Sequence, residues 1–238
     1  MPNIAIITAR GGSKRIPRKN IKDFLGKPII AYSIEAAIES KLFDEVMVST
    51  DDEEIGEIAM NFGAKVPFFR SLKTSDDFAT THDVILEVLS TYKNLDQNFD
   101  FACCIYPTAP FVNSKLLKNA FNILKENRSY DFVMPIVPFS FPIQRSFILE
   151  DDCKIRYAFP ENINKRSQDL RKHFHDTGQF YMFDVEKYFE RGSLVSSNMY
   201  GIEVSELMVQ DIDNEVDWKL AELKYSLMLK DNNIKDEY

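Results

Sequence analysis

Short apolar runs alternate with longer helical patterns over the first 137 residues. The runs Ile4–Ile7, Val46–Val48 and Ala102–Tyr106 are typical of buried strands, and a helical pattern separates each from the next. A strand, a helix and a second strand in this order form a right-handed crossover, which leaves the two strands parallel. The alternation therefore predicts an α/β fold with a mainly parallel sheet.

Local signals set the bounds of the other predicted elements. Pro28 opens a helix, because its missing N–H leaves no bond unmade at the first helical position. Asp51 is expected to cap a helix that runs through Phe62. Pro67 makes the strand 66–69 short or places it at a sheet edge. The remaining elements are strands over 132–135 and 179–183, the latter resuming the parallel pattern, and helices over 81–92, 113–127 and 214–230.

Residues 138–176 interrupt the alternation and contain no helical pattern of useful length. Their aromatic side chains alternate with polar ones: Phe139, Phe141, Phe147, Tyr157 and Phe159. This pattern predicts an extended or antiparallel insertion. Exposed aromatic residues in such number mark an interaction surface, so we expect a partner subunit to cover them. The prediction is one domain formed by residues 1–137 and 177–238, with residues 138–176 inserted in it.

The distribution of charge limits the class of ligand. The net charge is −8, which argues against a surface built to bind nucleic acid. Six basic residues nevertheless lie close together in the sequence: Arg10, Lys14, Arg15, Arg18, Lys19 and Lys22. An acidic protein that keeps such a cluster of positive charge is suited to a small anionic ligand.

The expected location is the cytoplasm, without contact with a membrane. No stretch approaches the roughly 20 apolar residues of a membrane span, and the N-terminus lacks the pattern of a signal peptide. The three cysteines, Cys103, Cys104 and Cys153, form neither a disulfide framework nor a zinc pattern. These features predict a soluble protein in a reducing compartment.

The segment Arg10–Asn20 follows the first predicted strand directly and is typical of a phosphate-binding loop. Gly11 and Gly12 allow a tight turn that exposes backbone N–H groups, and the cations Lys14 and Lys19 can contact phosphate oxygens. The glycine spacing matches neither a Walker loop nor the dinucleotide fingerprint. A solvated basic loop is the alternative interpretation.

Two further segments are expected at the same rim. The turn Tyr106–Thr108 leaves the carboxyl end of a predicted strand, as the loop does, and ligands of parallel sheets bind at that end. Asp211 and Asp213 are two residues apart, so in an extended segment their carboxylates face the same way, about 6–7 Å apart. That spacing allows both to bind one Mg²⁺ ion. Alternatively, Asp213 caps the helix that begins near Asn214.

The loop and its surroundings resemble the CMP-sialic acid synthetase family. In the loop, the matching residues are Ile7–Lys14 and Ile16–Asn20. Leu25–Pro28 and Val48–Asp52 continue a likeness that runs nearly end to end. One departure is Thr8, which stands where members of the family usually have proline.

A finer likeness points to one branch of that family. Lys14–Pro17 and Asp176–Tyr181 are most similar to the pseudaminic acid cytidylyltransferases. Arg15 stands where sialic-acid-type members usually have glycine, and Tyr106 where they have glutamine. These two departures favour a sugar other than sialic acid.

The resemblance implies a three-layer, Rossmann-like nucleotide-diphospho-sugar transferase fold and a homodimer that forms through residues 138–176. It also implies a reaction in which the anomeric hydroxyl of a nine-carbon acidic keto-sugar, pseudaminic acid, attacks the α-phosphorus of CTP. The products are a CMP-sugar and pyrophosphate, and the cofactor is Mg²⁺. The alternatives are a sugar phosphate as the acceptor, or sialic, legionaminic or 3-deoxy-octulosonic acid as the sugar, or a nucleotide-binding module without catalytic activity.

The resemblance also implies roles for individual residues. The expected catalytic residues are Arg10, Lys14, Lys19 and Asp211, and the expected metal ligands are Asp211 and Asp213. The expected nucleotide-binding residues are Arg10, Gly11, Gly12, Ser13, Lys14, Lys19, Asn20, Arg70, Thr81 and Thr108. The expected sugar-binding residues are Tyr106, Gln144, Arg166, His175, Gln179 and Tyr181. Five of these have structural alternatives: Arg70 as a surface arginine, Thr81 and Asp213 as helix caps, Tyr181 as a core aromatic and His175 as a surface or packed residue.

Overall fold

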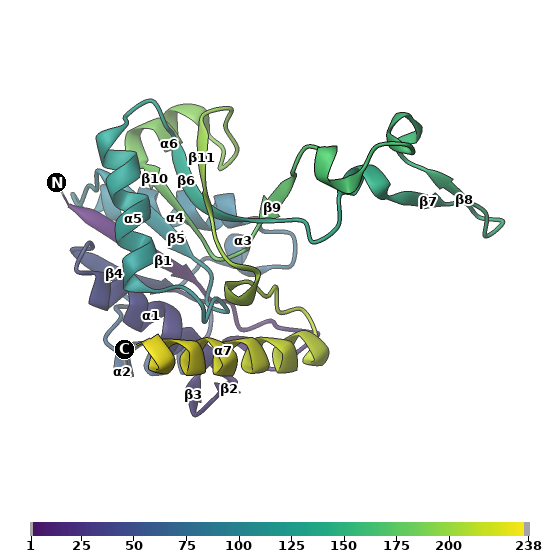
Figure 1. Cartoon of the computed structure of the whole chain (residues 1–238). Coiled ribbons are helices and arrows are strands. Elements are labelled where there is room, and N and C mark those ends of the chain that lie inside the picture. Colours follow the sequence, from purple (N-terminus) through teal and green to yellow (C-terminus); the bar gives the residue numbers. More distant parts are fainter. Residues whose placement is uncertain (1, 236–238) are drawn as a thin grey trace.

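The computed structural model describes residues 2–235, with side chains described through residue 230. Its body is a seven-stranded sheet with helices on both faces (Figure 1), in the strand order β11-β6-β10-β5-β1-β4, with β9 paired to β6. The strands of this sheet are β1 (Asn3–Thr8), β4 (Glu45–Ser49), β5 (Phe101–Ile105), β6 (Phe132–Pro138), β9 (Phe174–Asp176), β10 (Phe180–Asp184) and β11 (Met199–Glu203). The α-helices are α1 (Ile29–Ser40), α2 (Glu53–Asn61), α3 (Leu72–Ser75), α4 (Thr81–Asn94), α5 (Ser114–Glu126), α6 (Val185–Arg191) and α7 (Glu215–Lys235). None of the helices within residues 2–235 has the length and apolar character needed to cross a membrane.

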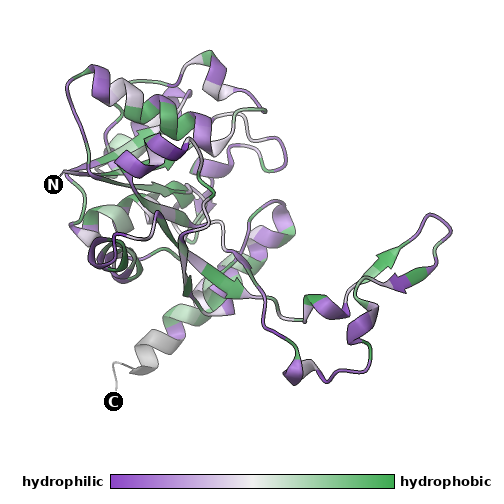
Figure 2. Ribbon diagram, turned by 90° about the horizontal axis from the view of Figure 1, so that it is seen from above, coloured by the Kyte–Doolittle hydropathy of each residue, from purple (hydrophilic) through white to green (hydrophobic). Residues whose placement is uncertain are grey.

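The apolar run of β1 explains why the sheet is covered on both faces. Ala5 and Ile7 pack in one core with α1, α2 and α5, while Ile4 and Ile6 pack in a second core with α4 and α6. Successive side chains of a strand point to opposite faces, so an uninterrupted apolar run requires cover on both. The body is therefore a three-layer α/β structure, and Figure 2 shows hydrophobic residues concentrated in its strands.

Five of the seven strands run in one direction, namely β1, β4, β5, β6 and β11. The predicted α/β class with a mainly parallel sheet is confirmed. The prediction that residues 179–183 resume the parallel pattern is wrong, because β10 pairs antiparallel with both β5 and β6. The chain leaves β6 at the carboxyl-end rim and comes back to the same rim through β9. The next strand, β10, therefore has to run away from that rim.

Two local predictions are corrected by the structure. The expected strand 66–69 is irregular, and only Lys65 forms an isolated parallel bridge, with Met47. Pro67 has no N–H with which to extend that bridge into a ladder. The cap of α2 is Asp52 rather than Asp51, because the Asp52 carboxylate accepts the backbone N–H of Ile55 at 3.0 Å.

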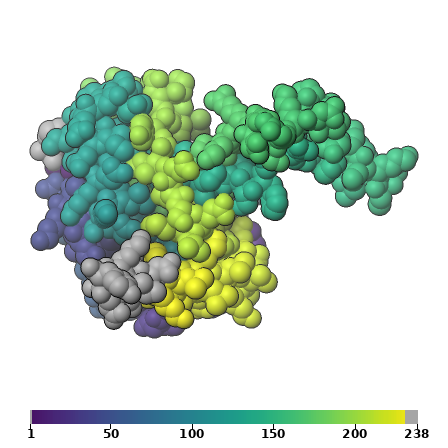
Figure 3. Space-filling view, viewed as in Figure 1, coloured from purple at the N-terminus to yellow at the C-terminus, as the bar shows by residue number. Residues whose placement is uncertain are grey.

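Residues 139–173 form an arm that projects away from the body (Figures 1 and 3). The antiparallel pairing of β6 with β9 closes its base, and a short antiparallel hairpin of β7 (Phe147–Leu149) and β8 (Ile155–Tyr157) lies toward its tip. Large apolar side chains of the arm are exposed, Phe141 to 83% and Leu149 to 69%. The arm is thus extended and antiparallel, as its sequence predicts, and it presents apolar residues to solvent.

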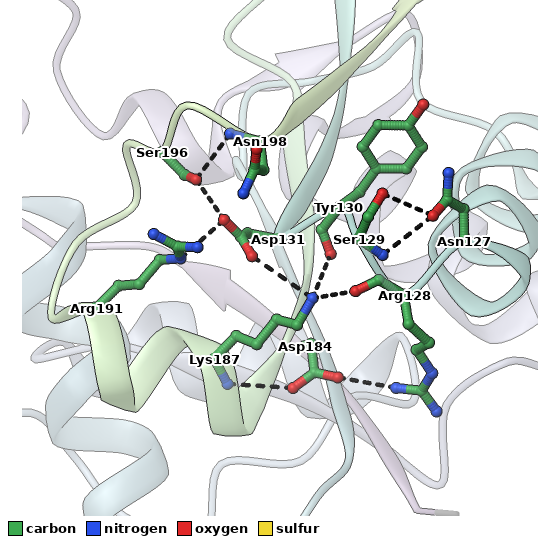
Figure 4. A network of polar contacts seen from close by, with 10 residues as sticks. All are labelled: Asn127, Arg128, Ser129, Tyr130, Asp131, Asp184, Lys187, Arg191, Ser196 and Asn198. Atoms are coloured by element: carbon green, nitrogen blue, oxygen red, sulfur yellow. Dashed lines mark hydrogen bonds and ion pairs between the residues drawn. The ribbon is translucent and has the colours of Figure 1, made fainter.

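A network of ion pairs around one buried carboxylate (Figure 4) lies at the start of β6, which is the end of the sheet opposite to the carboxyl ends of β1 and β5. Its centre is Asp131, which directly precedes β6 and whose side chain is 2% exposed. The carboxylate accepts from Arg191 Nε at 2.7 Å and from the Ser196 hydroxyl, and Lys187 Nζ lies 3.5 Å away. These contacts join α6 and the segment before β11 to the start of β6.

Candidate active site

The carboxyl ends of β1 and β5 open into a cleft of about 460 Å³. Segments far apart in the sequence line it: the loop after β1, the residues around the start of α4, and the turn after β5. The predicted site residues in its lining are Arg10, Ser13, Lys14, Lys19, Asn20, Arg70, Thr81, Tyr106, Thr108 and Asp213. The tertiary structure thus brings the predicted loop, the predicted turn and one of the two aspartates to a single rim.

An apolar cluster holds the basic loop close to the aspartate segment. Ile16 of the loop and Ile212, which separates the two aspartates, are each 1% exposed in one cluster with Phe24 and Trp218. Burial of a large aliphatic side chain contributes about 1.5–3 kcal/mol. The relative position of cations and carboxylates in the cleft is therefore fixed by ordinary hydrophobic packing.

Lys19 is the loop cation most closely tied to the aspartate segment. Its Nζ donates to the carbonyl of Ile212 at 2.7 Å. Burial lowers the pKa of the Lys19 ammonium, and the charges of Asp213 and Asp211 partly offset that effect. Both carboxylates therefore lie close enough to Lys19 to act on its charge, which places the three groups in one electrostatic environment.

Asp213 does not cap the last helix. The side chain of Asn214 does so, accepting from the N–H groups of Val216 at 2.8 Å and Asp217 at 3.1 Å. The Asp213 carboxylate instead lies 2.7 Å from Arg15 Nη2 and lines the cleft. The capping alternative is excluded, and the Asp213 carboxylate faces the loop.

Asp211 lines a smaller pocket of about 220 Å³, together with His175, Ser140 and Lys224. This pocket lies between the base of the arm and α7. Both carboxylates lie near Lys19, as the spacing of two residues predicts. They do not line the same cavity, however, because Asp213 lines the cleft and Asp211 lines the smaller pocket.

The donor set fits a magnesium ion that is shared with a substrate. Within the described residues, no three His, Cys, Asp or Glu side chains converge as they would in a site made entirely of protein ligands. Mg²⁺ usually binds one or two carboxylates and completes its shell with water and phosphate oxygens. Asp213 supplies one carboxylate in the cation-lined cleft, and Asp211, although it lines the smaller pocket, lies close enough to Lys19 to act on the same charge.

Two predicted nucleotide-binding residues, Gly11 and Asn20, also hold the loop in shape. The N–H of Gly11 donates to Asp51 Oδ1 at 2.8 Å, and a Cβ on Gly11 would lie 2.7 Å from an Asp52 oxygen. Glycine is required there by this close approach. The Asn20 amide donates to the carbonyl of Arg10 at 2.8 Å and joins the two ends of the loop. Gly12 has open space where a Cβ would stand.

Sequence reasoning missed the anchor formed by Arg18. This residue has a left-handed φ of 55°, and its guanidinium binds Asp52 at 2.5 and 3.0 Å and also contacts Glu54. Asp52 is the cap of α2, so the anchor ties the loop to that helix. Arg18 and the acidic residues Asp52 and Glu54 are all visible in the sequence, but the sequence does not show that they pair.

Asp77 is a second residue that the sequence did not single out. It lies between α3 and α4 and lines the cleft. Arg10 Nη1 is 2.9 Å from Asp77 Oδ1, and Lys14 Nζ contacts Asp77 Oδ2. An acidic residue in an exposed irregular segment has no periodic signal that would have identified it.

The floor of the cleft is formed by Arg70 and a pair of hydroxyls. The guanidinium of Arg70 donates to the carbonyl of Ser49 at 2.8 Å, and burial lowers its pKa to about 10. It is therefore neither a free surface arginine nor fully open to a ligand. Thr81 Oγ1 lies 3.1 Å from Tyr106 Oη, and the cap of α4 is Thr80, so Thr81 is not an ordinary helix cap.

Tyr181 lies beside the cleft and is not simply a core aromatic. Its ring packs edge-on against Tyr106 with centroids 6.0 Å apart, and its hydroxyl donates to Asp176 Oδ2. Burial and this hydrogen bond raise the pKa of Tyr181, so the phenol stays protonated. Asp176, at the end of β9, also accepts the N–H of Gly178 at 2.7 Å. A polar chain thus runs from Thr81 toward the base of the arm.

The remaining predicted sugar-binding residues lie away from the cleft. Gln179 is 3% exposed, and its amide donates to Met208 O at 2.5 Å. His175 lines the smaller pocket. Gln144 and Arg166 lie in the arm, where Gln144 donates to Arg171 O at 2.9 Å and Arg166 pairs with Asp169 at 2.8 Å. Within one chain, the arm carries the last two away from the loop.

Comparison with known proteins shows what this chain is similar to. The family model described as "Cytidylyltransferase" matches residues 4–199. The chain is 43% identical over 228 residues to the pseudaminic acid cytidylyltransferase of Campylobacter jejuni, covering 95% of this chain and 97% of that protein. It is 30% identical to the CMP-N,N'-diacetyllegionaminic acid synthase of Legionella pneumophila, over 92% of this chain and 94% of the relative.

A solved structure shows the same fold at low sequence identity. The structure of CMP:2-keto-3-deoxy-manno-octonic acid synthetase complexed with CTP matches 97% of this chain and 100% of its own, with a TM-score of 0.68 and 17% identity. The likeness extends over the whole sheet and its covering helices. It agrees with the three-layer, Rossmann-like architecture expected from the sequence.

Proposed function

The chain belongs to the cytidylyltransferase family, and we propose that it is a pseudaminic acid cytidylyltransferase. In the proposed reaction, the anomeric hydroxyl of this nine-carbon acidic sugar attacks the α-phosphorus of CTP, and pyrophosphate leaves. The single observation that carries the proposal is the cleft in which Arg10, Lys14 and Lys19 face Asp213. The identity of 43% to a protein named for this activity supports the choice of sugar.

The cleft supplies a place for each part of the nucleotide. Its volume of about 460 Å³ suits a small ligand. The triphosphate is proposed to bind Arg10, Lys14 and Lys19, each through charge-assisted hydrogen bonds of about 1.5–3 kcal/mol. The cytosine is proposed to lie against Arg70 and Thr81 on the floor. Positioning and charge stabilisation of this kind supply most of the catalysis in phosphoryl-type transfer.

Asp211 and Asp213 are the proposed ligands of magnesium. The ion, when bound, neutralises negative charge on the triphosphate and on the departing pyrophosphate. The chain's own contribution is to hold both carboxylates beside Lys19, through the burial of Ile212 and the bond from Lys19 Nζ to the Ile212 carbonyl. Arg15 keeps the Asp213 carboxylate directed toward the loop.

The arm is proposed to form a homodimer, which works in the cytoplasm with CTP and the free sugar. Exposed Phe141 and Leu149 supply an apolar surface, and Gln144 and Arg166 lie on the same element. Docking of the arm on a second copy is the means by which these two residues would come near a sugar site. Sedimentation at micromolar concentration should give a dimer, and a monomer alone would exclude this arrangement.

The test of function is pyrophosphate release from CTP with a panel of acidic sugars. The purified chain is assayed with Mg²⁺ and pseudaminic, legionaminic, sialic or 3-deoxy-octulosonic acid. We expect kcat/KM to be highest with pseudaminic acid by at least about tenfold, a difference of about 1.4 kcal/mol in transition-state binding. Asp211→Asn is the matched variant, because it removes one proposed metal-binding charge at nearly constant volume and should abolish Mg²⁺-dependent release.

Three results would contradict the proposal in different ways. Faster turnover of another sugar would reassign the substrate and leave the cytidylyltransferase chemistry intact. Binding of CTP without pyrophosphate release from any sugar would make the chain a nucleotide-binding module. Full activity of Asp211→Asn would exclude Asp211 as a metal ligand.

A further inference from the structure

The carboxylate of Asp77 bridges two cations of the loop. Oδ1 lies 2.9 Å from Arg10 Nη1, and Oδ2 contacts Lys14 Nζ. Arg10 Nη1 also donates to the carbonyl of Asp76 at 3.0 Å. Two oxygens on one central atom, each facing one cation, are the arrangement that a phosphate group offers. Asp77 and a phosphate therefore contend for the same two side chains.

The turn that presents Asp77 is fixed on both sides. The Asp76 carboxylate accepts the N–H groups of Phe78 at 2.9 Å and Ala79 at 2.7 Å, which closes a short turn around Asp77. The capping box of Thr80 and Asp83 then begins α4. These local bonds, which do not involve the loop, aim Asp77 into the cleft.

The contact itself is easily exchanged. Asp77 and Arg10 each keep about two fifths of the side chain exposed, at 42% and 38%, and Lys14 is 78% exposed. Phe78, the next residue, is 90% exposed, so apolar packing does not hold the turn at that point. Exposed ion pairs are weak, and a ligand that offers more negative charge can replace them.

We propose that Asp77 sets the affinity for phosphate-bearing ligands by competing with their polyphosphate for Arg10 and Lys14. A ligand gains only the difference between its own contacts with these cations and those of Asp77. The competition therefore weakens every anion that uses the two side chains and leaves a ligand without phosphate unaffected. Pyrophosphate remaining after transfer meets the same competitor, so Asp77 favours its release. This last consequence rests on the proposed function.

The test measures binding of inorganic pyrophosphate, CTP and cytidine to the full chain by titration calorimetry. In Asp77→Asn and Asp77→Ala, pyrophosphate and CTP should bind about threefold to tenfold more tightly, because two weak ion pairs no longer oppose them. Cytidine affinity should stay within about twofold, since it carries no phosphate. Asp77→Glu keeps the charge and should stay near the wild type. Glu57→Gln, on the exposed side of α2, controls for the change in net charge.

Three results of these titrations would overturn the competition by Asp77. Unchanged or weaker pyrophosphate binding in Asp77→Asn would overturn the proposal, and so would equal tightening in Glu57→Gln, which would show a general charge effect. Failure of the wild-type chain to bind pyrophosphate would overturn it as well. Calorimetry requires no turnover, so the proposed function can fail in the sugar assay while the competition stands. Conversely, the sugar assay can succeed while Asp77→Asn leaves pyrophosphate binding unchanged, which would reject the competition alone.

Discussion

The ion pairs at the two ends of the parallel strands differ in how exposed they are. At the carboxyl-end rim, the cations Arg10 and Lys14 are 38% and 78% exposed and meet a partner that is itself exposed, Asp77. At the amino end of the parallel strands, the Asp131 side chain is 2% exposed and contacts Arg191, Lys187 and Ser196 (Figure 4). The exposed cations Arg10 and Lys14 can exchange Asp77 for a ligand, whereas the buried Asp131 carboxylate cannot lose its donors without cost.

The difference separates a site for ligands from a structural joint. A buried carboxylate has lost its water and is tolerated only if protein donors replace that water. Asp131 has three donors from two elements, so the network stabilises one arrangement of α6, β6 and β11. The rim cations keep much of their hydration and pair weakly. That leaves most of their interaction capacity for an anion that enters the cleft.

The largest effect is expected at the rim, on activity rather than stability. Lys19→Ala should lower kcat about 10²–10³-fold, the usual loss when one preorganised donor to a reacting group is removed. The free energy of unfolding should change by about 1 kcal/mol or less, because the side chain donates one hydrogen bond, to the Ile212 carbonyl, and the burial of its ammonium outweighs its attraction to Asp213 and Asp211. Pyrophosphate release and urea unfolding measure the two quantities. Lys22→Ala, which removes a cation that follows the loop and pairs with Glu215 at 2.7 Å, is the matched control. A near-normal rate for Lys19→Ala would refute its role.

At the amino end of the strands, a substitution is expected to lower stability and to leave activity nearly unchanged. Asp131→Ala should lower the free energy of unfolding by about 2–3 kcal/mol, since Arg191 and Lys187 lose a buried partner but can regain water. Turnover per folded molecule should stay within about twofold. Asp152→Ala, in an exposed pair with Lys154 on the arm hairpin, should cost less than about 0.5 kcal/mol. Equal losses in the two variants would erase the contrast between buried and exposed pairs.

The same carboxylate makes stability depend on pH. Burial alone would raise the pKa of Asp131, but the Ser196 hydroxyl and the Arg191 and Lys187 charges outweigh it and hold the pKa below its ordinary value. The stabilisation is therefore complete above the unfolded-state pKa of about 3.9 and is lost as the pH falls through the lowered folded-state pKa. Wild-type stability should fall over this acid range more steeply than that of Asp131→Ala. Parallel curves would contradict the assignment.

The smallest effect concerns Arg18, a cation of the loop whose contacts are with structural residues. Arg18 binds the helix cap Asp52 at 3.0 Å and contacts Glu54, and it is 39% exposed. Arg18→Ala should lower the free energy of unfolding by about 0.5–1 kcal/mol, as a half-exposed pair does, and raise KM for CTP severalfold by loosening the loop. Arg18→Lys should restore stability only in part, because lysine cannot form the forked contact. A change in kcat without a change in KM would place Arg18 in the catalytic group instead.

The elements that the sequence predicts well are those with a strong local pattern. β1, β4 and β5 follow from apolar runs, and α4 and α5 from the helical patterns predicted over 81–92 and 113–127. The predictions that failed needed non-local information. Asp51 and Asp52 are alike in composition, and only the direction of each carboxylate decides which one caps α2. The direction of β10 depends on where the arm returns to the sheet. The roles of the predicted site residues, the metal and the dimer stay predictions.

By itself, the sequence determined the class of fold and the chemical character of the rim: a basic, glycine-containing loop after a buried strand, with two aspartates near the last helix. These follow from short-range rules, since side-chain periodicity and residue type are local properties. Only the tertiary structure decided which charges meet. Packing of Ile16 against Ile212 brings Lys19 to the aspartates, and the turn before α4 brings Asp77 to Arg10. Hydrogen bonds require donor–acceptor distances of about 3 Å, and exposed charges are screened beyond about 10 Å, so such pairings depend on the folded position of every partner.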